Sequence, residues 1–108
     1  MNALRTLLTS AALLTLASTS AMASQELATK KACLACHAID KKIVGPSYLD
    51  VAAKYKGKKG IEAVLVQKII KGSDAKALNW GTMPMPANAQ VNETEAKQLV
   101  TWILAMKK

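Results

Sequence analysis

The stretch CLACHAID, residues 33–40, decides how this chain folds, because it contains both cysteines and the only histidine of the 108 residues. Cys33, Cys36 and His37 form a C-x-x-C-H pattern, the spacing of covalent haem attachment. Thiols three residues apart face the same side of a helical turn, so both can add to the vinyl groups of one porphyrin as thioethers. The adjacent imidazole is then held close to the iron. The motif predicts one covalently bound haem c, with His37 as an axial ligand of its iron.

Three other chemistries use a Cys-x-x-Cys pair, and each fits this chain less well. A zinc site needs about four ligands, and Cys33, Cys36 and His37 have no second ligand pair elsewhere. A redox dithiol normally follows a strand of a βαβ unit, and no strand pattern precedes Cys33. A disulfide would close a very small loop within a helix. A thiol–disulfide or metal-delivery protein without haem is therefore the alternative interpretation.

The first 23 residues have the pattern of a secretory signal peptide. Arg5 supplies the positive charge, residues 7–17 are mostly apolar, and Ala21-Met22-Ala23 has the A-x-A form of a cleavage site. A membrane anchor is the alternative, but the apolar run is interrupted by hydroxyl residues and is shorter than the roughly 20 residues that a span needs. We expect cleavage after Ala23, export to the periplasm, and a mature domain of residues 24–108 without a transmembrane segment.

The composition of the mature part indicates a large apolar ligand and charged partners. A domain of this size buries a modest fraction of its surface, and this one has no Phe, two Trp and two Tyr. A porphyrin would supply the apolar body that these side chains do not. After Ala23 there are fourteen lysines and seven acidic residues, a net charge of +7. Export argues against nucleic acid, so we expect acidic protein surfaces as partners.

Four helical segments and no convincing strand are predicted from the apolar spacing. We expect Ser24 to cap a first helix that runs into the cysteine stretch. The second helix should span residues 48–55, and the third should span residues 60–71, with Gly72 at its C-terminal end.

The fourth helix should begin after Asn92, which forms a capping-box pattern with Glu95. Its apolar stripe consists of Leu99, Trp102, Ile103 and Met106. We expect this stripe to pack against Leu27 and its neighbours in the first helix. Residues 72–91 form a long loop rich in Gly, Pro and Asn, and loops of that length in a small domain are usually functional or disordered.

The second axial ligand decides what such a haem can do. His37 is the only histidine, so a second imidazole from this chain is excluded. The long loop offers Met83 and Met85, whose thioethers suit ferrous iron and raise the potential relative to two histidines. Pro84 and Pro86 flank Met85 and stiffen its backbone. Stiffness favours Met85, with Met83 as a competitor on chemistry alone.

The chain resembles the class I cytochromes c, in particular the small bacterial cytochrome c-551 and c-552 type, over residues 25–107. The motifs that carry the resemblance are Cys33–Asp40, Val44-Gly45-Pro46, Asp50–Lys54, Trp80-Gly81, Pro84-Met85-Pro86, Asn88-Ala89 and the helix with Trp102. The resemblance implies an all-α fold of four helices around one covalently attached haem. It also implies a one-electron carrier and not an enzyme. A haem enzyme or gas-binding protein, with an open sixth iron position, is the alternative.

The resemblance implies roles for residues around the haem. The family's axial methionine lies between the prolines, which selects Met85 over Met83. The Pro46 carbonyl would accept a hydrogen bond from the second ring nitrogen of His37, which makes the imidazole a better ligand.

Three more residues match positions that contact the haem or its ligand in that family. Asn88 matches an asparagine near the axial sulfur, and Trp80 matches a tryptophan that reaches a haem propionate. Lys68 stands where the family often has an arginine at the propionates, and lysine lacks the planar fork of arginine.

The resemblance implies redox proteins as partners, such as nitrite reductase, an oxidase, a peroxidase or a quinol-oxidising complex. It also implies that this carrier is a monomer. Lys41 and Lys42, just after the attachment motif, are the leading candidates for docking on acidic surfaces. The run Lys54–Lys59 is the second candidate.

Overall fold

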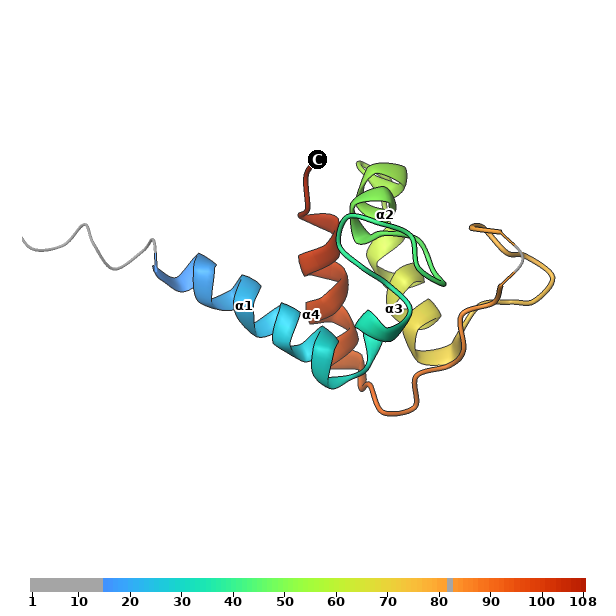
Figure 1. The fold of residues 1–108 in the computed structure, drawn as a ribbon, viewed down its shortest axis with the longest axis horizontal. Coiled ribbons are helices and arrows are strands. Elements are labelled where there is room, and N and C mark those ends of the chain that lie inside the picture. The colour runs from blue at the N-terminus through green and yellow to red at the C-terminus, as the bar shows by residue number, and fades with distance from the viewer. Residues whose placement is uncertain (1–14, 82) are drawn as a thin grey trace, which may run out of the picture.

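Residues 15–81 and 83–108 are described by the computed structural model, and within these ranges the chain is helical. The elements are α1 (Thr15–Lys30), the short 3-10 helix η1 (Cys33–Ala35), α2 (Tyr48–Tyr55), α3 (Ile61–Lys71) and α4 (Glu93–Leu104). α4 is the central element, because α1, α2 and α3 all pack against it. Figure 1 shows α1 on one side of α4 and α2 and α3 on the other. The predicted all-α fold is confirmed.

The start of α4 is set by its sequence. The Asn92 side-chain oxygen accepts a hydrogen bond from the Glu95 backbone N–H at 2.8 Å, and Glu95 Oε1 accepts one from the Asn92 N–H at 3.1 Å. This is the predicted capping box. The buried face of the helix consists of Ala96, Leu99, Val100 and Ile103. The helix ends at Leu104, so Met106 lies beyond it and not on the helical stripe that we predicted.

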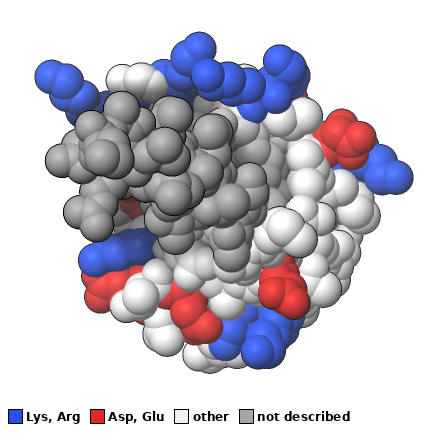
Figure 2. Space-filling model, turned by 90° about the vertical axis from the view of Figure 1, so that its left-hand side faces the viewer, with Lys and Arg blue, Asp and Glu red and all other residues white. Residues whose placement is uncertain are grey.

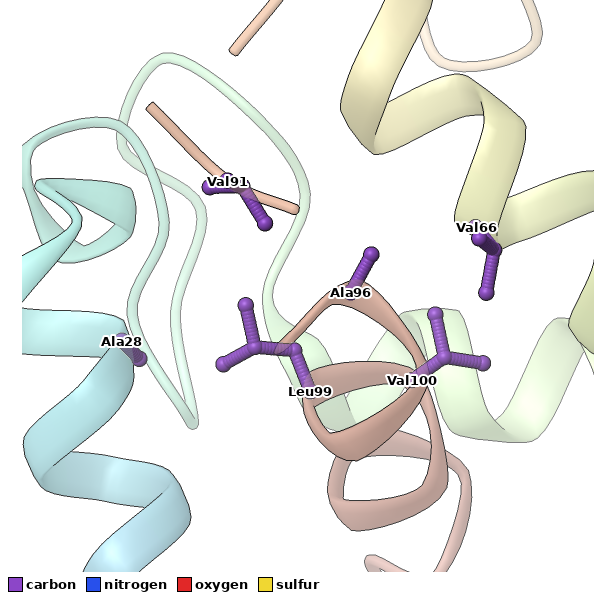
Figure 3. Packing of buried hydrophobic residues seen from close by; sticks show 6 residues of the cluster. All are labelled: Ala28, Val66, Val91, Ala96, Leu99 and Val100. Atoms are coloured by element: carbon purple, nitrogen blue, oxygen red, sulfur yellow. The ribbon is translucent and has the colours of Figure 1, made fainter. Parts of the chain in front are cut away.

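The hydrophobic core is built from small aliphatic side chains, as Figure 3 shows. Its members are Ala28 from α1, Val66 from α3, Val91 from the long loop, and Ala96, Leu99 and Val100 from α4. Leu99 and Val100 are the largest side chains that are almost fully buried. Leu27 and Trp102 pack against the cluster, as predicted for the contact between the first and last helices. Two aromatic side chains, Tyr48 and Tyr55 of α2, are also buried, outside this cluster.

The first helix differs from our prediction at its N-terminal end. α1 runs continuously through Thr15–Lys30, so Ser24 lies inside the helix and does not cap it. Ser24 is buried, its hydroxyl donates to the Ser20 carbonyl at 3.0 Å, and Gln98 donates to it at 3.3 Å. In the uncleaved chain, no Gly or Pro precedes Ser24 to end the helix. A cap at Ser24 is therefore possible only after cleavage. The first 14 residues of the expected signal peptide lie outside the described residues.

α2 and α3 begin and end close to the predicted positions. Ser47 caps α2, because its hydroxyl accepts a hydrogen bond from the Asp50 backbone N–H at 3.1 Å. α3 ends at Lys71 and is followed by Gly72, whose φ of 82° and ψ of 178° favour glycine. The loop that follows first lies on the side of α3 away from α1 and then returns to the C-terminal end of α1, as Figure 1 shows. There the Lys31 ammonium donates to the Gln90 carbonyl at 2.9 Å, and the Gln90 amide donates to the Lys31 carbonyl at 3.1 Å.

Basic side chains are distributed around the molecule. On the face shown in Figure 2, lysines lie at several places along the edge, with acidic side chains between them. None of the helices in the described part of the chain has the length and apolarity that a membrane span requires.

Candidate functional site

One cleft brings together most of the residues that the sequence singled out. The space between its walls is about 1080 Å³, including solvent at the open mouth. Of the predicted site residues it is lined by Cys33, Cys36, His37, Pro46, Lys68, Trp80 and Met85, together with the competitor Met83. The floor includes Leu99, Val100 and Ile103 of α4. Asn88 is the predicted site residue that does not line the cleft.

The attachment motif forms a tight turn at the edge of the cleft. The Cys33 carbonyl accepts hydrogen bonds from the N–H groups of Cys36 at 3.2 Å and His37 at 3.0 Å. The Cys36 carbonyl in turn accepts from Val44 at 3.2 Å and Gly45 at 2.8 Å. Both thiols are free and half-buried. The loop after the motif therefore folds back onto the turn that presents the two thiols.

The imidazole of His37 is oriented by the backbone that follows it. Its Nδ1 lies 2.8 Å from the Pro46 carbonyl oxygen, the hydrogen bond that the resemblance implied. A carbonyl can only accept, so Nδ1 carries the proton and Nε2 has a free lone pair. A Cβ atom on Gly45 would come within 2.5 Å of the ring. Any side chain at position 45 would collide with the imidazole, so a glycine is needed there.

Tyr48 is a site residue that our sequence analysis missed. Its ring stacks on His37 with centroids 5.1 Å apart and meets Trp102 edge-on at 5.7 Å. Its hydroxyl is hydrogen-bonded to Cys33. Burial raises the pKa of both the tyrosine and the Cys33 thiol, while the hydrogen bond with Tyr48 acts to lower the pKa of the thiol. The position of Tyr48, first in α2 and two residues after Pro46, was the available signal.

The two candidate methionines differ in exposure. Met83 is 66% exposed, whereas Met85 is half-buried in the cleft wall. The backbone of Met85 is hydrogen-bonded to Ser73 at the end of α3. Asn88 holds the same segment, because its backbone N–H and side-chain amide both donate to the Ile69 carbonyl, at 3.1 and 2.9 Å. The expected contact between Asn88 and the axial sulfur stays a prediction.

Trp80 lines the cleft beside a lysine of α2. The Lys54 ammonium lies 4.4 Å from the centre of the Trp80 ring and donates to the Asn79 carbonyl at 3.2 Å. Tyr55 meets Trp80 edge-on at 6.3 Å. Lys54 therefore holds the long loop against α2 through a cation–π contact and a hydrogen bond. This first lysine of the Lys54–Lys59 run has a structural partner that the sequence did not indicate.

The side chains of the cleft fit a covalently bound haem. Two thiols stand at the attachment spacing, one imidazole nitrogen is free to bind a metal, and a thioether lies in the same apolar cleft. Fold and site together define a small all-α protein built around a c-type haem.

Comparison with known proteins agrees with this class. The cytochrome c family model matches residues 21–107. Cytochrome c-551 of Pseudomonas aeruginosa is 53% identical over 77 residues, which cover 71% of this chain and 70% of the relative. Cytochrome c-552 of Hydrogenobacter thermophilus is 47% identical and covers 79% of this chain and 83% of the relative. The crystal structure of Nitrosomonas europaea cytochrome c552 is 43% identical, covers 77% of this chain and 99% of that chain, and has a TM-score of 0.72.

The chain belongs to the cytochrome c family. Its cofactor is one covalently attached haem c with iron, and its general role is electron transfer with redox proteins. The predicted family, fold and cofactor are confirmed.

Proposed function

We propose that this protein is a periplasmic one-electron carrier whose haem iron is ligated by His37 and Met85. It would deliver electrons to a terminal reductase or oxidase, such as nitrite reductase or cytochrome oxidase. The observation that carries the proposal is the cleft itself, which has the C-x-x-C-H motif and Met85 among its lining residues. When bound, the haem supplies exchange of one electron between the ferrous and ferric states of its iron.

The remaining work is done by residues of this chain. Cys33 and Cys36 attach the cofactor, and His37 binds through Nε2 because Pro46 holds the other ring nitrogen. Met85 supplies a thioether from a segment stiffened by prolines. With two protein ligands, no position is open for a substrate, so the protein carries an electron and performs no bond chemistry. Trp80 and Lys68 line the cleft and are proposed to contact the propionates.

Export is supported by the N-terminal sequence. We propose that residues 1–23 are a signal peptide cleaved after Ala23, leaving a monomeric domain of residues 24–108. The contacts of Leu27 and Ala28 with the core lie after this site and would be retained. Mass spectrometry of the exported protein tests the proposal, and a chain that still contains residues 1–23 contradicts it.

The ligand assignment is tested by two matched alanine variants. Met85→Ala should open the sixth iron position to water or added ligands, lower the reduction potential, and allow carbon monoxide to bind ferrous iron. Met83→Ala should do none of this, because Met83 is largely exposed. Absorption spectra and potentials of both variants provide the measurement. If the two variants exchange phenotypes, Met83 is the ligand; if neither loses the methionine–iron absorption band, both assignments fail.

Docking is proposed to use Lys41 and Lys42. Both are exposed and adjoin Ile43 and Val44, which are 47% and 46% exposed, and Val44 also lines the cleft. Charges beside an apolar patch would steer an acidic partner to the cleft, and steering weakens with salt because the screening length is about 8 Å at physiological ionic strength.

Reversal of both lysines to Glu should therefore lower the rate of electron transfer to an acidic redox protein, about tenfold or more at low salt. The spectrum should not change. Stopped-flow mixing over a range of salt measures the rate. Lys30→Glu with Lys107→Glu is the matched control, since it changes the net charge equally at exposed residues that neither adjoin Val44 nor belong to the Lys54–Lys59 run. Equal rates in the two double variants would mean that net charge alone acts.

A further inference from the structure

The two residues that follow α3 touch the backbone of residues 84–88, which we call the Met85 segment. A Cβ atom on Gly72 would lie 2.8 Å from the Met85 carbonyl oxygen and 2.8 Å from the Ala87 nitrogen. The two backbones therefore meet with no room for a side chain between them. Ser73 is next in sequence, is half-buried and lines the cleft. The end of α3 is thus the surface against which the Met85 segment packs.

Ser73 binds both polar backbone groups of Met85. The Ser73 N–H donates to the Met85 carbonyl at 2.9 Å, and the Met85 N–H donates to the Ser73 hydroxyl oxygen at 3.2 Å. Proline has no N–H, so Met85 supplies the only backbone donor between Pro84 and Pro86. The hydroxyl of Ser73 accepts that donor. Two bonds from one residue therefore set both the position and the direction of the Met85 backbone.

Among the described residues, the hydrogen bonds that reach the Met85 backbone all come from Ser73. Asn88 donates to the Ile69 carbonyl and, at 3.3 Å, to the Pro86 carbonyl. These bonds hold the point at which the segment returns to α3, and none of them involves Met85 itself. The prolines stiffen the segment but do not decide where it lies in the molecule. Its placement at Met85 depends on Ser73.

We propose that Ser73 is the positioning residue for Met85, and that its hydroxyl sets how readily an added ligand displaces the thioether from the haem iron. The inference rests on the proposed function, in which Met85 is an axial ligand. The Ser73 hydroxyl holds the methionine through its backbone, so its removal leaves the thioether chemically unchanged. What changes is the equilibrium between bound and displaced methionine. Loss of one ordinary hydrogen bond corresponds to a change of roughly fivefold in that equilibrium.

The test is displacement of the methionine by imidazole in the ferric, haem-loaded protein. Loss of the methionine–iron absorption band reports the displacement. Ser73→Ala removes the hydroxyl acceptor and keeps the backbone bond, while Ser73→Thr restores an acceptor. Asn92→Ala is the matched control, because it removes another side-chain acceptor of a backbone N–H, at 2.8 Å, in the α4 capping box. That change weakens the domain as a whole.

We expect imidazole to bind Ser73→Ala about fivefold more tightly than the wild type. Binding to Ser73→Thr and Asn92→Ala should lie within about twofold of the wild type. Wild-type affinity in Ser73→Ala overturns the inference, and so does an equal gain in Asn92→Ala, which would indicate general loosening. Met85→Ala is measured in parallel. If it keeps the band, the ligand assignment fails and the inference with it; if it loses the band while Ser73→Ala behaves as wild type, the inference alone fails.

Discussion

Replacement of Gly72 by alanine should be among the most damaging small changes in this protein. Gly72 has φ 82° and ψ 178°, a conformation that is essentially restricted to glycine and costs other residues about 1–3 kcal/mol. The added methyl group would also lie 2.8 Å from two backbone atoms of the Met85 segment. Backbone cannot rotate away as a flexible side chain can, so α3 and the segment must separate. We expect a loss of about 3–5 kcal/mol in the free energy of unfolding, near the upper range for single changes.

Gly57→Ala is the matched control for this prediction. Gly57 has φ 73°, so alanine is strained there too, but nothing lies within 4 Å of the added atom. We expect Gly57→Ala to cost about 1–2 kcal/mol. Urea unfolding followed by circular dichroism measures both variants, and the methionine–iron absorption band should weaken in Gly72→Ala alone. Equal losses in the two variants, with the band intact, would refute the argument that close approach to the Met85 segment is what requires glycine at position 72.

Two further predictions concern α4 and its surroundings. Trp102 packs against the core but is half-buried. Trp102→Ala should therefore lower the free energy of unfolding by about 2–4 kcal/mol, less than the usual loss for a fully buried tryptophan. A loss under about 1 kcal/mol in urea unfolding would contradict the packing role of Trp102. The hydrogen bond from the Asn92 N–H, with Lys31 nearby, lowers the pKa of Glu95. The ionised Glu95 carboxylate therefore stabilises the fold fully above the unfolded pKa of about 4.3, and this stabilisation is lost as the pH falls through the lower folded pKa. Glu95→Gln should therefore flatten the fall in stability between about pH 5 and pH 2, and unfolding curves as steep as those of the wild type would show that the charge of Glu95 has no part in it.

Local signals in the chain were sufficient for the elements and the chemistry of attachment. The capping box of Asn92 and Glu95 and the glycine at position 72 act within a few residues, so the C-terminal end of α3 and the start of α4 follow from the sequence alone. The C-x-x-C-H motif likewise depends on neighbours within one turn. Two local predictions differed: α1 starts before Ser24, because the helix continues through the expected cleavage site, and α4 ends at Leu104, before Met106.

What the sequence by itself determined is therefore the set of helices, the haem and its candidate ligands, all of which depend on short spacings. Only the tertiary structure decided which distant groups hold those ligands. Tyr48 stacks on His37, Ser73 binds Met85 across twelve positions, and Lys54 binds the Asn79 carbonyl across twenty-five. Such contacts exist because α2, α3 and α4 pack around one cleft. No local spacing encodes them, since each depends on where two separately formed elements come to lie.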